Sequence, residues 1–193
     1  MPQSNDAFDR IRGSAFKKRE DCSSVVLRGS VARVASHLFS DSSHDFQFFT
    51  RSESKATDLQ ISKWMPGSPR TGGFRSRVLT YKTPMSFVVG PPSTRVREEN
   101  FMSFTSGGGA IIETHAHAQD VPGGDLFRVE LYFELLPNNN RERTILRTSV
   151  AVHFSGSTML KIIIKSSVKS ESSRKLLAYP EAAKYWLERP RVL

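Results

Sequence analysis

The fold class follows from one alternating stretch, Phe127-Arg128-Val129-Glu130-Leu131-Tyr132-Phe133-Glu134-Leu135. Apolar residues recur there at every second position, and charged residues stand between most of them. Successive side chains of a β-strand point to opposite faces, so this stretch is a strand with one buried and one wet face. The following stretch repeats the pattern with Leu146, Val150, Val152 and Phe154. Two such neighbours predict an antiparallel meander.

Turn-forming residues divide the rest of the chain into further strands at regular intervals. The breaks at residues 66–69, 107–109, 122–124 and 137–140 are rich in Pro, Gly and Asn. They leave six expected strands, at residues 57–65, 74–82, 94–105, 110–118, 126–136 and 143–154. A β-prone run at residues 25–27 adds a first strand, which makes about seven.

Two short helices are expected after that first strand. Apolar residues at helical spacing follow the N-cap residue Ser30, namely Val31, Val34, Ala35, Leu38 and Phe39. After a break at residues 41–43, the apolar cluster at residues 46–49 predicts a second, shorter helix.

A long final helix is expected to begin at Ser157 and to run to about Ala178, where Pro180 interrupts it. Its first two turns are apolar around nearly the whole circumference, as in a helix enclosed by other structure. Residues 181–188 could then form a separate short helix. This order of elements predicts an α+β helix-grip fold, in which a curved antiparallel sheet wraps a long C-terminal helix and a cavity lies between them.

A chain of 193 residues, 38% hydrophobic and 24% charged, is typical of one globular domain. We expect a flexible leader at residues 1–22, the domain at residues 23–179 and an extension at residues 180–193. We find no pattern of a secretory signal or of a membrane span, and the single Cys22 cannot form an internal disulfide. A cytoplasmic location is therefore expected.

The net charge of +9 favours an anionic partner, either nucleic acid or an anionic membrane surface. Eight basic and three acidic residues from Lys161 onward supply five of the nine charges. The aromatic residues fall mostly on the apolar strand faces and no nucleic-acid-binding motif is present, so we expect no nucleic acid partner.

Patterns for catalysis or metal binding are weak. His115 and His117 share one strand face, but no acidic residue at an obvious spacing completes a ligand set, so solvent-facing histidines are expected. Ser, His and Asp form no recognisable triad, and the glycine-rich segments lack the residues of a phosphate loop. Hydrolase, kinase and dehydrogenase activities are disfavoured, and no catalytic residue, metal or cofactor is expected.

One connection is too apolar to face water without a reason. The loop at residues 83–92 carries Phe87, Val88 and Val89, and its ends are shaped by Pro84, Gly90, Pro91 and Pro92. We expect it to cover a cavity or to touch a membrane, and ordinary packing on the core is the alternative.

A series of motifs occurs in the order expected of one family. It comprises Trp64, residues 77–81 with Pro84, the run Gly90-Pro91-Pro92-Ser93-Thr94, residues 120–127, and Phe154 with residues 157–161. This series resembles the VASt family, the StART-like lipid-binding domains that accompany GRAM domains in proteins such as the Aster and Lam sterol transporters. The resemblance covers about residues 25–178. It departs from the family pattern at Pro92, Gly123 and Gly156, which bear on membrane affinity and ligand identity.

The resemblance implies a StART-like fold and a non-enzymatic cavity, usually for a sterol, that the 83–92 loop closes during lipid transfer between membranes. It leaves room for a GRAM domain or a membrane anchor in a longer parent protein, and for a peripheral location that includes ER contact sites. The expected partners are a sterol or other lipid and an anionic membrane surface. The alternative is a StART-like scaffold that binds a protein or a phospholipid headgroup without an enclosed lipid; an enzyme or an RNA-binding protein of this fold comes third.

The predicted site has two parts. Candidate ligand-binding residues are Trp64, Tyr81, Phe87, Val89, Phe104, Ile112, Phe133, Val150, Val152, Met159 and Ile163. The predicted membrane-contacting loop contains Pro84, Phe87, Val88, Val89, Gly90 and Pro91.

Overall fold

The computed structural model describes residues 19–67, 74–85, 91–139, 142–156 and 161–189, without the side chain of Ile163. In chain order the elements are β1 (Glu20–Arg28), α2 (Val31–Phe39), α3 (His44–Glu53), β2 (Thr57–Ile61), β3 (Arg75–Pro84), β4 (Ser93–Phe104), β5 (Ala110–Ala118), the 3-10 turn η3 (Gly124–Leu126), β6 (Phe127–Pro137), β7 (Arg143–Phe154) and α4 (Lys161–Glu188).

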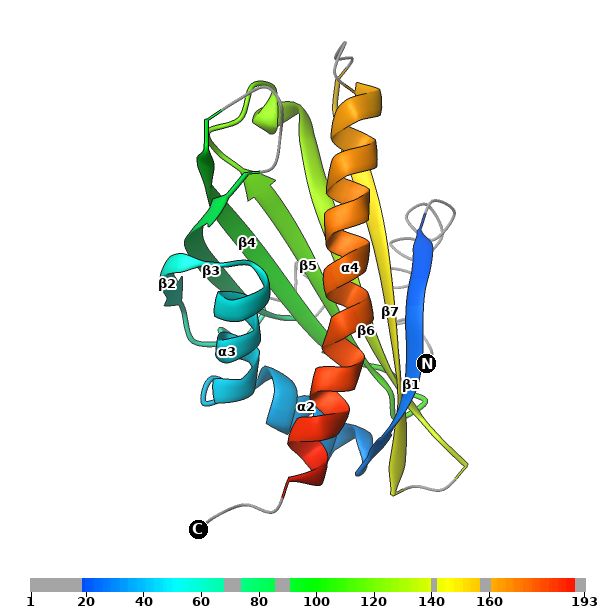
Figure 1. Ribbon diagram of the computed structural model, residues 1–193. Helices are drawn as coiled ribbons and strands as arrows, with labels where there is room; N and C mark the ends of the chain where they lie inside the picture. Colours follow the sequence, from blue (N-terminus) through cyan, green and yellow to red (C-terminus); the bar gives the residue numbers. More distant parts are fainter. Residues whose placement is uncertain (1–18, 68–73, 86–90, 140–141, 157–160, 190–193) are drawn as a thin grey trace.

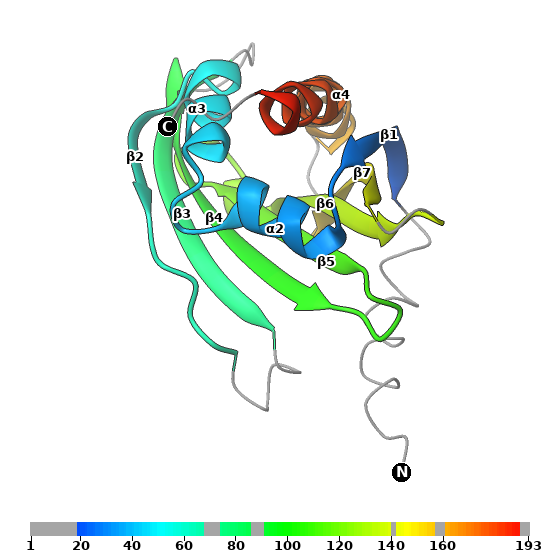
Figure 2. The ribbon, with the colours of Figure 1, turned by 90° about the horizontal axis from the view of Figure 1, so that it is seen from below.

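The described strands form one seven-stranded antiparallel sheet in the order β1-β7-β6-β5-β4-β3-β2. Consecutive strands from β2 to β7 pair with one another, and β1 joins the far edge by pairing with β7, where Val25 lies opposite Leu146. The sheet curves around α4, and α2 and α3 lie on the same concave side (Figures 1 and 2). The predicted α+β fold, with two short helices after the first strand, is confirmed.

Two strands differ from the prediction by more than two residues at one end. The first strand is β1, Glu20–Arg28, rather than residues 25–27, so Glu20 to Cys22 belong to the sheet and not to a leader. Strand β2 ends at Ile61 rather than at residue 65. Beyond it the Ser62 hydroxyl accepts the Val78 N–H, and Met65 forms an isolated bridge with Ser76. A polar side chain thus replaces part of the backbone ladder.

Serine hydroxyls cap both short helices. Ser30 Oγ accepts the Arg33 N–H at 3.4 Å, and Ser43 Oγ accepts the Phe46 N–H at 3.3 Å. Such caps satisfy backbone donors that have no partner inside the helix. The apolar spacing after Ser30 therefore predicts the position of α2 correctly.

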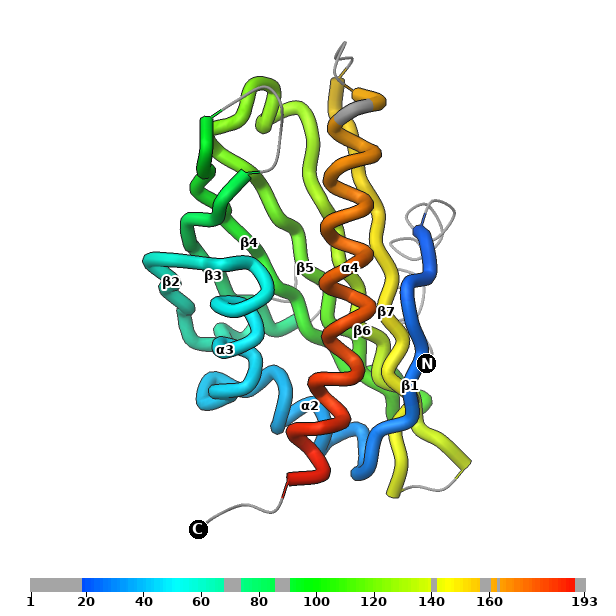
Figure 3. The backbone as a smooth tube through the Cα atoms, in the orientation of Figure 1, coloured from blue at the N-terminus to red at the C-terminus, as the bar shows by residue number. Residues whose placement is uncertain are grey.

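Helix α4 continues through Pro180 to Glu188, so the expected interruption at Pro180 is wrong (Figure 3). A proline inside a helix offers no N–H to the carbonyl four residues earlier, which here is that of Leu176. The Leu176 carbonyl instead accepts hydrogen bonds from Thr148 Oγ1 at 3.0 Å and from Ser23 Oγ at 3.3 Å. Strands β7 and β1 thus supply the donors that Pro180 lacks.

The first turn of α4 is more exposed than expected. Ile162 is 82% exposed, whereas Ile164 is buried. The expected cap Ser157 lies outside the described residues. The helix starts at one end of the curved sheet, where strands cover only one of its sides (Figure 1). One side of the first turn is therefore buried and the other faces solvent.

The apolar core lies at the other end, between α2, the second half of α4 and the sheet. The Tyr179 ring packs against Phe49 and Phe133, with centroids 4.9 and 5.1 Å apart. Phe39 and Trp186 extend the same aromatic cluster. No helix in the described part of the chain has the length and apolarity needed to cross a membrane.

Candidate functional site

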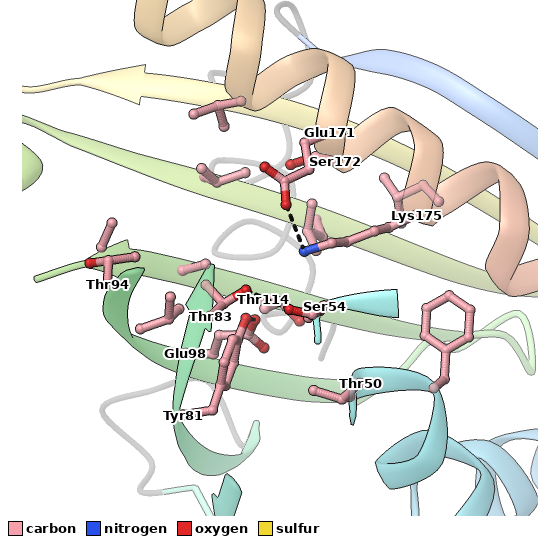
Figure 4. A pocket seen from close by; sticks show the side chains of 18 of the residues that line it. Thr50, Ser54, Tyr81, Thr83, Thr94, Glu98, Thr114, Glu171, Ser172 and Lys175 are labelled. Carbon is pink, nitrogen blue, oxygen red and sulfur yellow. Dashed lines mark hydrogen bonds and ion pairs between the residues drawn. The ribbon is translucent and has the colours of Figure 1, made fainter. Parts of the chain in front are cut away.

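A cavity of about 150 Å³ lies between α3, the middle of α4 and the concave face of β3 to β6 (Figure 4). Its wall is mainly apolar and is formed by Phe46, Phe49, Tyr81, Pro84, Met85, Val96, Ala116, Ala118, Phe127, Val129, Leu131, Phe133, Val168, Leu176 and Tyr179. The polar lining residues are Thr50, Ser54, Thr83, Thr94, Glu98, Thr114, Glu171, Ser172 and Lys175. An apolar wall with a few polar groups suits a mostly apolar ligand that carries a polar function.

Strand β5 makes room for this cavity because its inward side chains are small. Thr114, Ala116 and Ala118 line the cavity, while His115 and His117 occupy the alternate positions. The sequence alternation predicts this arrangement, since successive strand residues face opposite sides. Larger residues at the two alanines would occupy the space beneath α4.

Glu98 is the buried acid of the cavity. It is 9% exposed, and the Tyr81 hydroxyl donates to its Oε1 at 2.5 Å. Burial raises the pKa of Glu98, although the hydrogen bond from Tyr81 and the charge of Lys175 act in the opposite direction. Burial and the neighbouring carboxyl also raise the pKa of Tyr81, which keeps its proton. A carboxyl whose protonated form is favoured can donate as well as accept a hydrogen bond.

Helix α4 contributes an ion pair on the opposite side of the cavity. Lys175 Nζ lies 3.5 Å from Glu171 Oε1, one turn earlier in the helix, and both residues line the cavity (Figure 4). The side chain of Lys175 is 20% exposed and that of Glu171 is 43% exposed, so the pair marks the boundary between the cavity and solvent.

A row of polar residues crosses the sheet next to the cavity. Arg77 Nε donates to Asn100 Oδ1 at 3.1 Å, and Asn100 Nδ2 donates to Thr114 Oγ1 at 3.0 Å. The guanidinium also contacts the rings of Phe46 and Trp64, and its Nη2 has no hydrogen-bond partner within the described residues. Burial lowers the pKa of Arg77 to about 10, which leaves it charged at neutral pH.

The predicted wall residues are only partly brought together. Tyr81 and Phe133 line the cavity. Ile112 and Val150 are buried in the core and Val152 is half-buried, but none of the three is among the described lining residues.

Trp64 and Phe104 lie away from the cavity. Trp64 Nε1 donates to the Phe39 carbonyl at 2.6 Å, so its ring packs beside Arg77. Phe104 is the last residue of β4 and is 57% exposed. Met159, Phe87, Val89 and the side chain of Ile163 lie outside the described residues.

The expected membrane-contacting loop is described at its two ends only. Strands β3 and β4 pair as far as Pro84 opposite Ser93, and the Met85 N–H donates to the Pro92 carbonyl at 2.9 Å. Pro84 and Met85 line the cavity, so the loop starts at its rim. Pro91 is half-buried, and Phe87, Val88, Val89 and Gly90 lie outside the described residues.

Several lining residues are not predicted by any local sequence pattern. Glu98 and Thr114 stand at inward positions of β4 and β5, and a buried acid is not expected from alternation alone. Phe46 and Phe49 of α3 also line the cavity, although that helix was expected only as a compact insertion. Contacts between distant elements determine these positions.

Glycines shape the turn before β6. Gly123 has a φ of 71°, a left-handed conformation that glycine adopts without strain. A Cβ at Gly124 would lie 2.1 Å from the Ala118 carbonyl oxygen. The turn can therefore pack closely on the end of β5 only with glycine at this position.

The outer sheet face carries a cluster of ionisable side chains that the sequence pattern does not predict. Glu130 lies opposite His115 in the β5–β6 register, and Glu113, His115 and Glu130 place ligand-type atoms within 4.8 Å of one another. An acidic partner for His115 therefore exists, contrary to the expectation. Glu130 already accepts hydrogen bonds from Arg128 and Tyr132. Hydrogen bonds from the protein itself therefore compensate for the burial of the Glu130 carboxylate.

Comparisons with known proteins agree with this geometry. The model of the VASt family, the VAD1 analog of StAR-related lipid transfer domain, matches residues 22–171. A search of curated proteins gave no match.

Three solved structures show the same fold. Truncated norcoclaurine synthase from Thalictrum flavum has a TM-score of 0.55 and 11% identity, covering 90% of this chain and 95% of its own. A StAR-related lipid transfer protein fragment from Xanthomonas axonopodis has a TM-score of 0.53 and 12% identity, and the match covers 86% of this chain and 84% of the fragment. Human StAR-related lipid transfer protein 5 has a TM-score of 0.52 and 11% identity, and the match covers 96% of this chain and 98% of the human chain.

At these identities the solved structures establish the fold alone. The family model, in contrast, matches most of the chain, and the sheet wrapped around α4 is the StART-like arrangement that the motif series predicts. The chain belongs to the VASt family of StART-like, lipid-binding domains.

Proposed function

We propose that the chain binds a lipid, in the first instance a sterol, in the cavity beneath α4 and transfers it between membranes without catalysing a reaction. The cavity itself carries this proposal, because aromatic and aliphatic side chains line it and Glu98 offers a polar contact. A sterol has the same division into a large apolar body and one hydroxyl. Glu98 and Tyr81 are the candidate partners of that hydroxyl.

The cavity of about 150 Å³ is smaller than the roughly 300–1,000 Å³ typical of ligand pockets. Uptake of a sterol would therefore require the wall to open. Among the described residues, α3 and α4 are joined by the ion pair of Arg174 with Glu53 at 3.7 Å and by the aromatic contacts of Phe49, so we expect the wall to open between these two helices.

Membrane docking is proposed at the end of the molecule where α4 begins. Ile162 is 82% exposed there, between the exposed Lys161 and Lys165. Insertion of an apolar side chain and attraction of lysines to anionic lipids reinforce each other, at about 1 kcal/mol for each lysine near the surface. The loop at residues 83–92 is proposed as the gate beside it. A peripheral, cytoplasmic location follows, with ER contact sites reached through a longer parent protein.

A transfer assay between liposomes tests this function. The double variant Phe87→Asp, Val89→Asp is expected to lose most sterol transfer while its thermal unfolding is unchanged, because the charges would oppose insertion of the gate. Bound sterol is measured separately, so that a defect in docking is distinguished from a defect in binding. Unchanged transfer would leave the loop as ordinary packing.

The alternative is a scaffold of the same fold that encloses no lipid. The small cavity favours it, since a site already filled by side chains would show this volume. Co-purification of a lipid with the chain would exclude the scaffold, whereas a lipid-free chain that accepts none in solution would favour it.

A further inference from the structure

A polar groove leads sideways from the cavity, between α4 and the corner where α3 turns into β2. The groove has a volume of about 370 Å³. Ser54, Thr83, Pro84 and Glu171 line both the groove and the cavity, so the two spaces meet along a shared wall. In the views along and across the sheet, α3 lies beside α4 (Figures 1 and 2). A ligand in the cavity could therefore extend into solvent at this side as well as at the end of α4.

The groove carries balanced charges. Its described acidic residues are Glu53 and Glu171, and its described basic residues are Lys55 and Arg174. An ion pair between two described residues, Arg174 Nη1 and Glu53 Oε2, crosses the groove at 3.7 Å, and their side chains are 64% and 33% exposed. Exposed pairs of this kind stabilise a protein little and are readily exchanged for other partners.

Lys55 occupies an unusual backbone position in this groove. It follows α3 with a φ of 48°, and the Ala56 N–H donates to the Arg51 carbonyl at 3.1 Å, which is the pattern of a helix end that usually has glycine in the left-handed place. Lys55 makes no ion pair with any described residue, and it is exposed. A lysine is thus held at the groove in a conformation that glycine would adopt more easily.

We propose that this groove binds the headgroup of a zwitterionic glycerophospholipid, while an acyl chain of the same lipid enters the cavity. The phosphate would lie between Lys55 and Arg174, because guanidinium and ammonium groups bind phosphate oxygens. The positively charged end of the headgroup would lie near Glu53 and Glu171. The inference rests on the proposed function, since it takes the cavity as a lipid site, and it adds a second class of cargo to the sterol.

Other lipid classes fit these charges less well. An anionic headgroup such as that of phosphatidylinositol has no cationic group to lie near Glu53 and Glu171. A sterol hydroxyl is too small and uncharged to engage all four charged residues. A flexible acyl chain can also enter the cavity at its present volume of about 150 Å³, whereas a sterol needs the opening of the wall proposed above.

The test is native mass spectrometry and fluorescence transfer of the full chain with two probes, dioleoylphosphatidylcholine and cholesterol. The charge reversal Lys55→Glu, Arg174→Glu is expected to lower phosphatidylcholine occupancy at least tenfold and to leave cholesterol occupancy unchanged. The matched control Lys63→Glu, Lys184→Glu makes the same change in net charge at exposed positions outside the groove and should bind both lipids as wild type does.

A second variant addresses folding. Lys55→Gly removes one phosphate-binding charge and relieves the left-handed backbone, so phosphatidylcholine occupancy should fall several-fold while the melting temperature rises. Cholesterol binding without phosphatidylcholine binding would overturn the headgroup proposal and leave the lipid-binding function intact. An equal loss of phosphatidylcholine occupancy in the groove and control variants, or no loss in either, would also overturn the headgroup proposal. Binding of neither lipid would overturn the proposed function together with this inference.

Discussion

Pro180 has no N–H to donate to the Leu176 carbonyl, and side chains of the sheet donate to it instead. A double-mutant cycle measures how much this replacement stabilises the protein. Thr148 is 1% exposed, and its hydroxyl lies 3.0 Å from both the Leu176 carbonyl and Ser23 Oγ. Thr148→Val keeps the shape of the side chain and removes both contacts. With about 1 kcal/mol for each hydrogen bond, we expect the free energy of unfolding to fall by about 2 kcal/mol.

In a Pro180→Ala background the new alanine N–H can reach the Leu176 carbonyl, so the same Thr148→Val change should cost only about 1 kcal/mol. The predicted coupling energy is therefore about 1 kcal/mol, within the range measured for residues that share a partner. Urea unfolding followed by circular dichroism measures all four proteins, and each 1 kcal/mol corresponds to roughly 2–4 °C in melting temperature. Thr80→Val, at a half-buried position on β3, is the control. Equal losses in both backgrounds would refute the compensation.

Three further predictions concern pH and packing. The pKa of Glu98 is higher in the folded than in the unfolded chain, where it is near 4.5. Its contribution to the free energy of unfolding is therefore fully present below the unfolded pKa and is lost as pH rises through the folded pKa. Glu98→Gln should therefore gain stability over wild type as pH increases, and a pH-independent difference in urea midpoints would contradict this. Hydrogen bonds from Arg95 lower the pKa of Asp120 to about 2, so the contribution of Asp120 is present above pH 3.8 and is lost as pH falls through about 2. In Asp120→Asn, the melting temperature should therefore fall less than in wild type when the pH is lowered from 3.8 to about 2. Gly124→Ala should destabilise the domain by about 1–3 kcal/mol, because the Ala118 carbonyl blocks the added methyl group, and an unchanged melting curve would show that the turn can move.

The fold was predictable because its signals are local. The alternation from Phe127 to Leu135 indicates a strand with one buried face, and the serine before Val31 indicates a helix start. Each of these patterns depends on residues close together in the sequence. The number of strands and the position of the long helix follow from such patterns and from the turns between them.

The continuity of α4 was not predictable from the helix itself. Pro180 is a helix-breaking signal in any local reading, and the donors that compensate for it stand on β1 and β7. The position of Trp64 is a similar case, since its indole N–H is bound by the Phe39 carbonyl at the end of α2. These outcomes depend on pairs of residues far apart in the sequence.

The candidate site was predictable only in outline. Alternation indicates that Tyr81 and Phe133 face inward, and both line the cavity. Alternation does not say which inward residues lie below α4 and which lie in solid core, so it cannot separate Phe133 from Ile112 or Val150. That distinction depends on where α3 and α4 cross the sheet.

The most direct test of the central claim is whether a lipid occupies the cavity beneath α4. Native mass spectrometry of the full chain after incubation with a lipid extract should show one bound lipid per chain. Ala116→Phe, which would fill the cavity floor, should abolish that adduct, while Gln60→Phe, at an exposed position of β2, should retain it. A lipid adduct that persists unchanged in a folded Ala116→Phe variant, or a wild-type chain that takes up no lipid, would contradict the account.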